Sequence, residues 1–167
     1  SLEKVQKAGA VFNIQKLDHI NGHYIKEKSD EALLKICGPY LPQGYEKFPK
    51  KTLEKIIATA KPRMKKLSEI VLLCDFFFQE KLQYDKNLLR WKQMLDGEVK
   101  NSLETSAKIL SATKKFDQKS LETLLVKEAS TFAQGYGGQG KNPDRGYLLW
   151  PLRIALSGKK ASASPFE

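Results

Sequence analysis

Residues 146–167 read GYLLWPLRIALSGKKASASPFE. The first half of this stretch is apolar at helical spacing, and it carries a proline and an arginine, Pro151 and Arg153. Gly158 stands where a left-handed residue commonly ends a helix, so the pattern predicts a helix over residues 147–157 that is kinked at Pro151. The small and polar residues that follow, ending in Ser-Pro-Phe-Glu, predict a loop.

The same helical period runs through the rest of the chain. Apolar residues recur three and four positions apart, and β-branched residues are not gathered into short runs bounded by glycine. We therefore expect an all-α fold. Ser29 and Asp117 are expected N-caps, and helices are expected over residues 30–37, 49–60, 67–74, 86–93, 97–112, 119–134 and 147–157.

The chain is expected to form two helical subdomains, residues 1–78 and 79–167, with Phe76, Phe77 and Phe78 at their interface. The glycine-rich run over residues 135–144 has no preceding strand and no following Lys-Ser or Lys-Thr, so it predicts a flexible connector rather than a phosphate-binding loop. A start without Met, on a segment that already looks helical, is expected of a fragment of a longer protein.

The charge balance favours a polyanionic partner. Of 167 residues, 29 are Lys or Arg and 19 are Asp or Glu, so the net charge is +10, which suits nucleic acid or an anionic surface. A merely soluble basic protein is the alternative. Seven basic groups lie between Lys50 and Lys66 against one acid, Glu54. Such a run is either a solvated face or a phosphate-binding surface, and the candidate phosphate contacts are Lys50, Lys61, Lys65, Lys66, Lys159 and Lys160.

Catalytic and metal sites are not expected in this chain. His19 and His23 have a spacing that can hold zinc, but the glutamate of the metalloprotease motif is absent between them. Cys37 and Cys74 fit neither a metal site nor a disulfide framework, which predicts buried thiols in a reducing, cytoplasmic compartment. The apolar runs are too short to span a bilayer, so no membrane association is expected.

Four segments resemble bacterial glutamyl-tRNA synthetases. Residues 10–25, AVFNIQKLDHINGHYI, are similar to the family pattern G-x-V-F-D-x-x-K-L-x-W-x-N-x-x-Y-I, with Asn13 and His19 departing from it. Residues 61–69, KPRMKKLSE, are similar to R-P-R-x-x-x-L-x-E, and residues 150–158, WPLRIALSG, to P-L-R-x-A-L-T-G. The fourth segment is the loop that follows, in which Ala163 stands where the family has proline.

The resemblance implies the carboxy-terminal, anticodon-binding part of such an enzyme, folded as a helical cage. It implies that Arg63 reaches the anticodon, and that Ser162, Ala163 and Pro165 touch the middle anticodon base. The partner it implies is tRNA-Glu, bound by a monomer. It places ATP and magnesium in a catalytic domain missing from this chain, with no cofactor here and no activity of the fragment alone. It also implies that the family's closing helix is truncated.

Physical chemistry gives a reason for an arginine at position 63. A guanidinium offers only donors, while the pairing edge of cytosine presents the acceptors N3 and O2 and that of guanine presents donors. Arg63 therefore predicts a preference for glutamate anticodons, which end in C, over glutamine anticodons, which end in G.

Other assignments stay open at this point. Arg153 contacts a base or holds the neighbouring loop. Four aromatic residues stack on loop bases or belong to the core: Tyr136, Tyr147, Trp150 and Phe166. A free-standing basic helical RNA-binding protein and a helical protein-interaction scaffold are the alternative functions.

Overall fold

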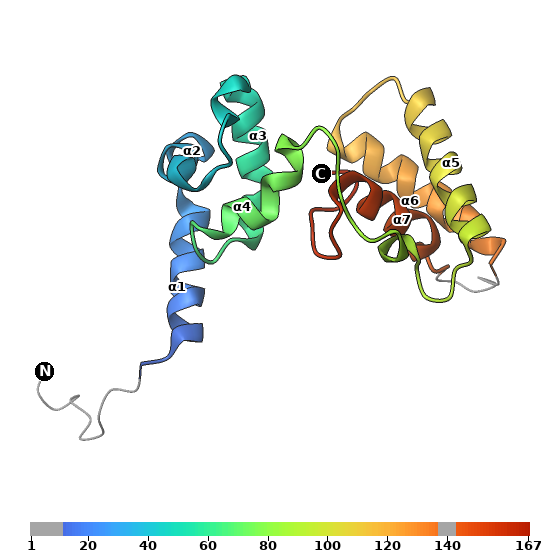
Figure 1. Cartoon of the computed structure of the whole chain (residues 1–167), viewed down its shortest axis with the longest axis horizontal. Helices are drawn as coiled ribbons and strands as arrows, with labels where there is room; N and C mark the ends of the chain where they lie inside the picture. Colours follow the sequence, from blue (N-terminus) through green and yellow to red (C-terminus); the bar gives the residue numbers. More distant parts are fainter. Residues whose placement is uncertain (1–11, 137–142) are drawn as a thin grey trace, which may run out of the picture. The chain divides into compact units, whose positions relative to one another are not determined.

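The computed structural model describes residues 12–136 and 143–167 (Figure 1). Within these ranges all regular structure is helical and no strand is present, so the expectation of an all-α fold is confirmed. The helical start expected in residues 1–11 and the glycine-rich connector at residues 137–142 lie outside the described residues.

Contacts divide the chain into two compact units, Ser1–Cys74 and Asp75–Glu167. The division expected from the sequence, after residue 78, assigned residues 75–78 to the first subdomain, whereas their contacts join them to the second unit. The division into two functional subdomains stays a prediction, and so does an interface role for the three phenylalanines.

In the first unit, residues 12–74 form four α-helices and three short 3₁₀ turns. In chain order they are α1 (Ile14–Glu27), α2 (Asp30–Cys37), η2 (Gly38–Tyr40), η3 (Tyr45–Lys47), α3 (Lys50–Ala60), η4 (Lys61–Arg63) and α4 (Glu69–Cys74). The Ser29 side chain accepts a hydrogen bond from the backbone N–H of Ala32 at 3.2 Å, so it caps α2 as expected. Pro49 stands directly before α3, where its missing N–H costs no hydrogen bond.

The core of the first unit lies where α3 packs against α2 and α4. Its fully buried side chains come from all three helices and include Leu33, Ile57 and Ile70. Cys37 and Cys74 are buried free thiols, as the sequence predicts. Burial raises the pKa of Cys37 to about 11, because the apolar surroundings disfavour the thiolate.

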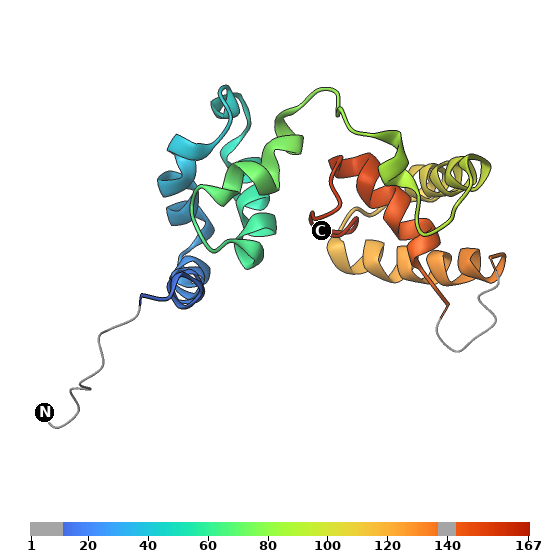
Figure 2. The ribbon, with the colours of Figure 1, turned by 60° about the horizontal axis from the view of Figure 1, so that its bottom comes forward.

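Helix α1 leads away from the rest of its unit, and Figure 2 shows its amino-terminal end without a neighbouring helix. The helix contacts the rest of its unit at η4 and at the turn that follows η4. Large apolar side chains along the helix and just before it are left exposed, from 43 % for Ile20 to 75 % for Phe12; this apolar stripe consists of Phe12, Ile14, Leu17, Ile20 and Tyr24.

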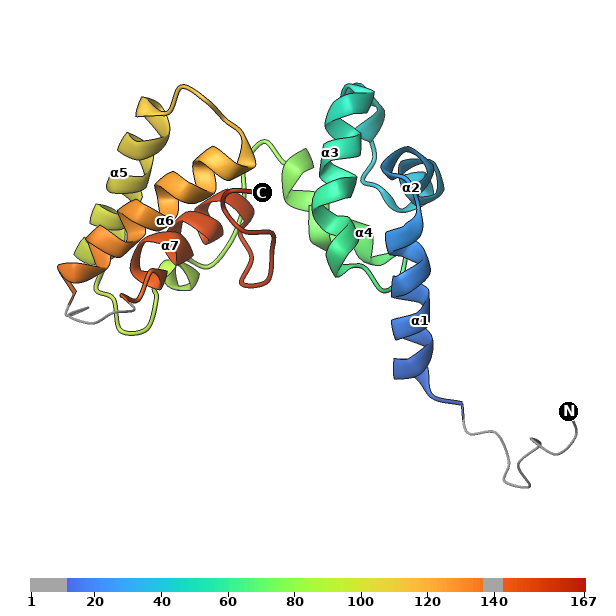
Figure 3. The ribbon, with the colours of Figure 1, turned by 180° about the vertical axis from the view of Figure 1, so that it is seen from behind.

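The described part of the second unit, residues 75–136 and 143–167, contains three α-helices and two 3₁₀ turns. The elements are η5 (Asp75–Phe78), η6 (Lys86–Leu89), α5 (Asp96–Ala112), α6 (Gln118–Gln134) and α7 (Gly146–Ser157). Helix α7 packs against both α5 and α6, and Figure 3 shows α6 beside α7. Asp117 caps α6 by accepting a hydrogen bond from the Ser120 N–H at 3.0 Å, which confirms its expected role.

Helix α7 follows the prediction closely, with Pro151 inside it and Gly158 ending it at φ 68°. The helix expected over residues 86–93 is wrong: the structure has only the turn η6, Lys86–Leu89. Lys92 adopts a φ of 53°, in the left-handed region that an α-helix cannot pass through. None of the described helices has both the length and the apolar character needed to cross a bilayer.

Candidate nucleic-acid interface

Arg63 lies at the surface of the first unit, at the end of η4. Pro62 interrupts α3 and turns the chain, and the Arg63 guanidinium folds back so that Nη1 donates to the Thr59 carbonyl oxygen at 2.7 Å. Arg63 is thus exposed and oriented at the same time. Its guanidinium has five N–H donors and no acceptor.

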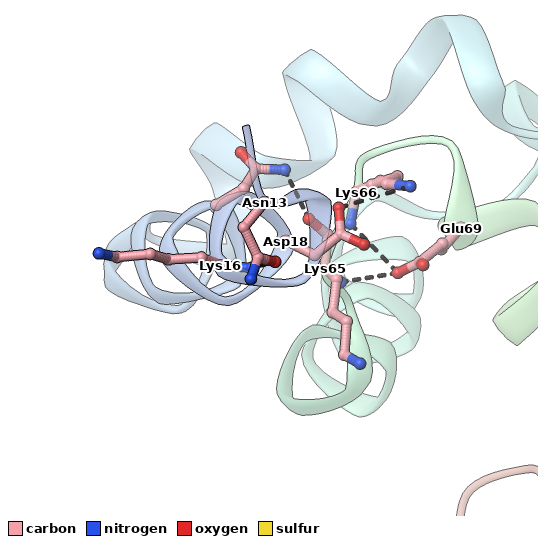
Figure 4. Close-up of polar contacts among 7 residues, drawn as sticks. Asn13, Lys16, Asp18, Lys65, Lys66 and Glu69 are labelled. Carbon is pink, nitrogen blue, oxygen red and sulfur yellow. Dashed lines mark hydrogen bonds and ion pairs between the residues drawn. The ribbon is translucent and has the colours of Figure 1, made fainter. Parts of the chain in front are cut away.

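The turn that follows Arg63 is fixed by Glu69, the last residue of the segment KPRMKKLSE. The Glu69 carboxylate accepts from the backbone N–H groups of Lys65 at 2.6 Å and Lys66 at 3.1 Å (Figure 4). The carboxylate therefore acts as a local cap for a turn that carries three basic side chains. This gives a structural reason for the spacing between the arginine and the glutamate in that segment.

Helix α1 is joined to the same turn at two points. Gly22 is buried, and a Cβ atom placed there would lie 3.2 Å from the Met64 carbonyl oxygen, so the helix and the turn are in close approach. The Asn21 side chain donates to the Lys65 carbonyl oxygen. A hollow of about 180 Å³ lies along this contact, with Arg63 and Lys65 on one side and His19, His23 and Lys26 of α1 on the other.

The lysines chosen from the sequence fall into two groups. Three have carboxylate partners from other parts of the unit. Lys50 contacts Glu31, which raises the pKa of Lys50 and lowers that of Glu31 because each charge stabilises the other. Lys61 lies 3.1 Å from Asp30 and donates to the Lys28 carbonyl oxygen, and Lys66 lies 3.4 Å from Asp18.

Lys65 differs from these three. Its ammonium lies outside the dashed contacts of Figure 4, and no carboxylate of the described chain pairs with it. The run of like charge in residues 50–66 is thus partly neutralised by acids that are distant in sequence. Of the four candidate lysines in this run, Lys65 therefore remains the most available to a phosphate.

In the second unit the structure brings three of the candidate residues together. Arg153, Ala163 and Pro165 line one hollow of about 390 Å³, whose other walls are Phe76, Phe77, Leu156, Ser157, Ser164 and Glu167. The sequence did not indicate the phenylalanines as part of this site. Their signal was weak because a Phe-Phe-Phe run reads equally well as core or interface.

Ser162 has a different position. Its hydroxyl donates to the Ala163 carbonyl oxygen at 3.1 Å and lies 3.0 Å from Ser157 Oγ, inside the loop. Of the two lysines beyond α7, Lys159 lies 2.5 Å from Asp75 Oδ1, and Lys160 is exposed.

The aromatic residues near α7 mainly contact one another. Tyr136 stacks on Tyr147 at a centroid distance of 5.0 Å, and Trp91 lies 5.1 Å from Trp150. The Trp150 indole donates to the Leu88 carbonyl oxygen at 2.8 Å. Tyr136, Tyr147 and Trp150 therefore pack within the protein, as expected if they belong to its core.

Trp91 and Trp150 also line a second hollow of about 510 Å³ with Arg145 and Arg153. Asp144 holds one side of it, accepting from the Trp91 indole at 3.1 Å and from the Gly146 N–H at 3.0 Å. The Lys92 ammonium lowers the pKa of Asp144 by stabilising its carboxylate. Arg153 thus lines both of these hollows.

No group of three or more His, Cys, Asp and Glu side chains that could hold a metal is found in residues 12–136 and 143–167. His23 Nε2 lies 3.0 Å from Glu27 within α1. The surface around Arg63 carries cationic and imidazole groups beside the Asp18 carboxylate. The hollow at Arg153 combines a guanidinium with serine hydroxyls, phenylalanine rings, aliphatic groups and the Glu167 carboxylate. Cationic and aromatic groups of this kind suit the binding of a polyanion with unstacked bases.

The chain belongs to the anticodon-binding domain family, whose family model matches residues 32–167. Its curated relatives include the glutamate–tRNA ligase of Borreliella afzelii, 32% identical over 174 residues that cover 100% of this chain and 34% of that protein. The glutamate–tRNA ligase of Clostridium kluyveri is 35% identical over 168 residues, covering 96% of this chain and 31% of that protein. The chain therefore spans about a third of the length of these relatives.

Solved structures show the same fold. A glutamate tRNA ligase from Elizabethkingia meningosepticum, crystallised in complex with its amino acid, superposes with a TM-score of 0.70 at 23% identity. The match covers 99% of this chain and 31% of that one. The glutamate-tRNA synthetase of Elizabethkingia anophelis gives a TM-score of 0.67 at 22% identity, over 99% of this chain and 30% of that one.

Proposed function

We propose that this chain is the anticodon-binding part of a glutamate–tRNA ligase and that its partner is tRNA-Glu. The observation that supports this most is the extent of the similarity: proteins named glutamate–tRNA ligase match the chain over its whole length. A free-standing RNA-binding protein and a helical interaction scaffold are less favoured, because neither accounts for a match that covers about a third of long ligases.

Within this proposal Arg63 recognises the last anticodon base. The side chain is exposed, and its contact with the Thr59 carbonyl oxygen orients the guanidinium. The N–H donors of a guanidinium complement the N3 and O2 acceptors of cytosine and oppose the donors of guanine. A donor left unpaired against guanine costs about 1 to 3 kcal/mol, which corresponds to about a tenfold to hundredfold preference for tRNA-Glu over tRNA-Gln.

Phosphate contacts in the proposal come mainly from Lys65 and Lys160, which are exposed, with Lys50, Lys61, Lys66 and Lys159 contributing where they can leave their carboxylate partners. Arg153, Ala163 and Pro165 would contact the middle anticodon base, and Ser162 would hold their loop. The intact ligase would attach glutamate with ATP and magnesium in a catalytic part outside this chain. A cytoplasmic location and a monomeric state belong to the same proposal.

The test is a comparison of tRNA-Glu and tRNA-Gln transcripts that differ in their last anticodon base. Dissociation constants are measured for the unchanged chain and for Arg63→Gln, whose amide can both donate and accept. We expect the unchanged chain to prefer tRNA-Glu and Arg63→Gln to lose most of that preference. Arg90→Gln is the matched control, since it removes the same charge from an arginine paired with Asp96 in the other unit.

An unchanged ratio in Arg63→Gln would remove the role given to Arg63. Failure of the unchanged chain to distinguish either tRNA from an RNA hairpin of unrelated sequence would remove the proposed function itself. Measurement at two salt concentrations adds a check, because the affinity for RNA falls steeply with salt through counterion release.

A further inference from the structure

We infer that the hollow between α1 and η4 binds one phosphate group of an RNA backbone, through the ammonium groups of Lys26 and Lys65 and the imidazole of His19. The inference rests on the proposed function and adds a contact from α1 that reads no base. The hollow belongs to the first unit, at the point where Gly22 of α1 closely approaches the turn after η4.

Three side chains of α1 line the hollow because their spacing places them on one side of the helix. His19, His23 and Lys26 stand four and three positions apart, and Gly22 lies between them on the same side. Gly22 is buried against the Met64 carbonyl oxygen. The polar side chains before and after Gly22 therefore lie along the edge of this contact, opposite Lys65.

His19 is the imidazole that is available to a phosphate. It stands where the glutamyl-tRNA synthetase pattern has tryptophan, and its side chain is exposed. An imidazole offers one N–H donor when neutral and two when protonated, on a much smaller ring than an indole. His23 is less available, because its Nε2 lies 3.0 Å from Glu27. The site is therefore a property of this chain rather than of the family pattern.

The charges around the hollow favour an anion. Lys26 and Lys65 are exposed, and within the described part of the chain no carboxylate pairs with either of them. The Asp18 carboxylate also lines the hollow and opposes an anion, but the Lys66 ammonium lies 3.4 Å from it and offsets its charge (Figure 4). The carbonyl end of α1 adds a partial negative charge of about half a unit. Two unpaired ammonium groups outweigh that half charge.

The size and the walls of the hollow favour a phosphate over a base. Its volume is about 180 Å³, which is below the range of about 300 to 1,000 Å³ that is usual for small-ligand sites. The described residues that line it include no Phe, Tyr or Trp, so a base would find no large aromatic face for stacking. Ammonium and imidazole groups are good donors to phosphate oxygens. Because the proposed partner is a tRNA and the net charge is +10, the phosphate is assigned to RNA.

The experiment maps the phosphates of full-length tRNA-Glu that the chain requires. End-labelled tRNA-Glu is ethylated so that each molecule carries a single neutral phosphate, and the bound and unbound molecules are compared position by position. The unchanged chain is compared with Lys26→Gln, Lys65→Gln and His19→Phe. Lys16→Gln is the matched control, since Lys16 is an exposed lysine of the same helix that extends away from Lys65 in Figure 4.

We expect one phosphate, or two neighbouring ones, at which ethylation prevents binding of the unchanged chain but makes no difference to Lys26→Gln or Lys65→Gln. Lys26→Gln should also reduce the slope of log affinity against log salt by about 1. It should weaken the binding of tRNA-Glu and tRNA-Gln by equal factors, because a phosphate contact carries no sequence information. Lys16→Gln should leave the positions of interference unchanged, and thermal melting confirms that each variant is folded.

His19 is tested by two replacements. His19→Phe keeps a ring but removes the N–H donor, so it should weaken the binding of tRNA-Glu about twofold to tenfold, as for the loss of one hydrogen bond. His19→Gln should restore most of the affinity, because its amide can donate to a phosphate oxygen. Equal affinities of His19→Phe and the unchanged chain would remove His19 from the site.

The phosphate site is overturned if ethylation interferes at the same positions for Lys26→Gln as for the unchanged chain, or if Lys16→Gln alters them in the same way as Lys26→Gln. Calorimetry with inorganic phosphate identifies the source of the anion: saturable micromolar binding that is lost in Lys26→Gln would overturn the assignment to RNA. If tRNA-Glu binds no better than a hairpin of unrelated sequence, the proposed function fails. Anticodon-dependent binding with interference that ignores Lys26 overturns the phosphate site alone.

Discussion

The Glu69 carboxylate accepts a hydrogen bond from the Lys65 backbone N–H at 2.6 Å, and this contact closes the turn that follows Arg63. It joins the carboxylate at the start of α4 to the residues that connect η4 with that helix. Arg63, Lys65 and Lys66 therefore keep their positions through a negative group that lies on the same short segment.

Removal of this carboxylate should loosen the turn. For Glu69→Ala we expect a loss of about 1 to 2 kcal/mol in the free energy of unfolding, the usual size for a lost cap with charged hydrogen bonds. Urea denaturation measures the loss. Glu46→Ala, at an exposed position of the same unit, should change little, and an equal loss in both variants would contradict the capping role.

Lys61 and Lys65 should respond differently to removal of their charge. Lys61 is 21% exposed in its side chain and bonds Asp30 and the Lys28 carbonyl, so Lys61→Ala should mainly lower stability. Lys65→Ala should leave stability nearly unchanged and weaken RNA binding, with the slope of log affinity against log salt reduced by about 1. Salt titrations of RNA binding and melting curves of the two variants give the comparison. A stability loss in Lys65→Ala together with an RNA-binding loss confined to Lys61→Ala would contradict this assignment.

Gly146 should not tolerate a side chain. A Cβ atom there would lie 2.2 Å from Trp91 Cε2, so Gly146→Ala must displace the indole that bonds Asp144. We expect a loss of about 1 to 3 kcal/mol, as for other overpacked sites. Gly97→Ala is the control, because its Cβ atom would meet nothing within 4 Å in helix α5, and a gain of up to about 1 kcal/mol is expected there. Tryptophan fluorescence and urea denaturation report both effects.

The cap of α6 should make stability depend on acid. Hydrogen bonds from Ser120, with Lys115 nearby, lower the pKa of Asp117 from 3.8 to about 2. A group with a lowered folded-state pKa contributes its stability above the unfolded-state value, and that contribution is lost as the pH falls from about 4 toward 2. Asp117→Asn keeps the cap without a titrating charge, so its melting temperature should fall less than that of the unchanged chain between pH 6 and pH 3. Parallel curves for the two proteins would contradict this assignment.

The helices were predictable because their ends carry local signals. Ser29 and Asp117 bond the first turns of α2 and α6, and Gly158 takes the left-handed conformation after α7. The expected helix 86–93 is wrong because nothing in the local pattern announces the left-handed φ of Lys92. That residue is held by its ion pair with Asp144, which is far away in sequence.

The site was less predictable than the fold for the same reason. Charge counting within residues 50–66 could not reveal that Asp18, Asp30 and Glu31 supply carboxylates from other helices. Spacing alone also could not reveal that the Ser162 hydroxyl bonds inside its loop, to Ser157 and the Ala163 carbonyl, whereas Ser164 Oγ is buried without a partner among the described residues. These contacts depend on the course of the loop. The turn after Arg63 was more predictable, because the proline before the arginine and the glutamate after it lie in one short motif. The role of Arg63 in base recognition stays a prediction.

The exposed apolar stripe on and beside α1 affects the solution behaviour of the chain; it consists of Phe12, Ile14, Leu17, Ile20 and Tyr24. Exposed apolar surface of this kind promotes adsorption to plastic, binding of detergent and self-association as the protein concentration rises. Light scattering should therefore accompany every RNA titration, and RNA binding should be measured in dilute samples, in which self-association does not interfere.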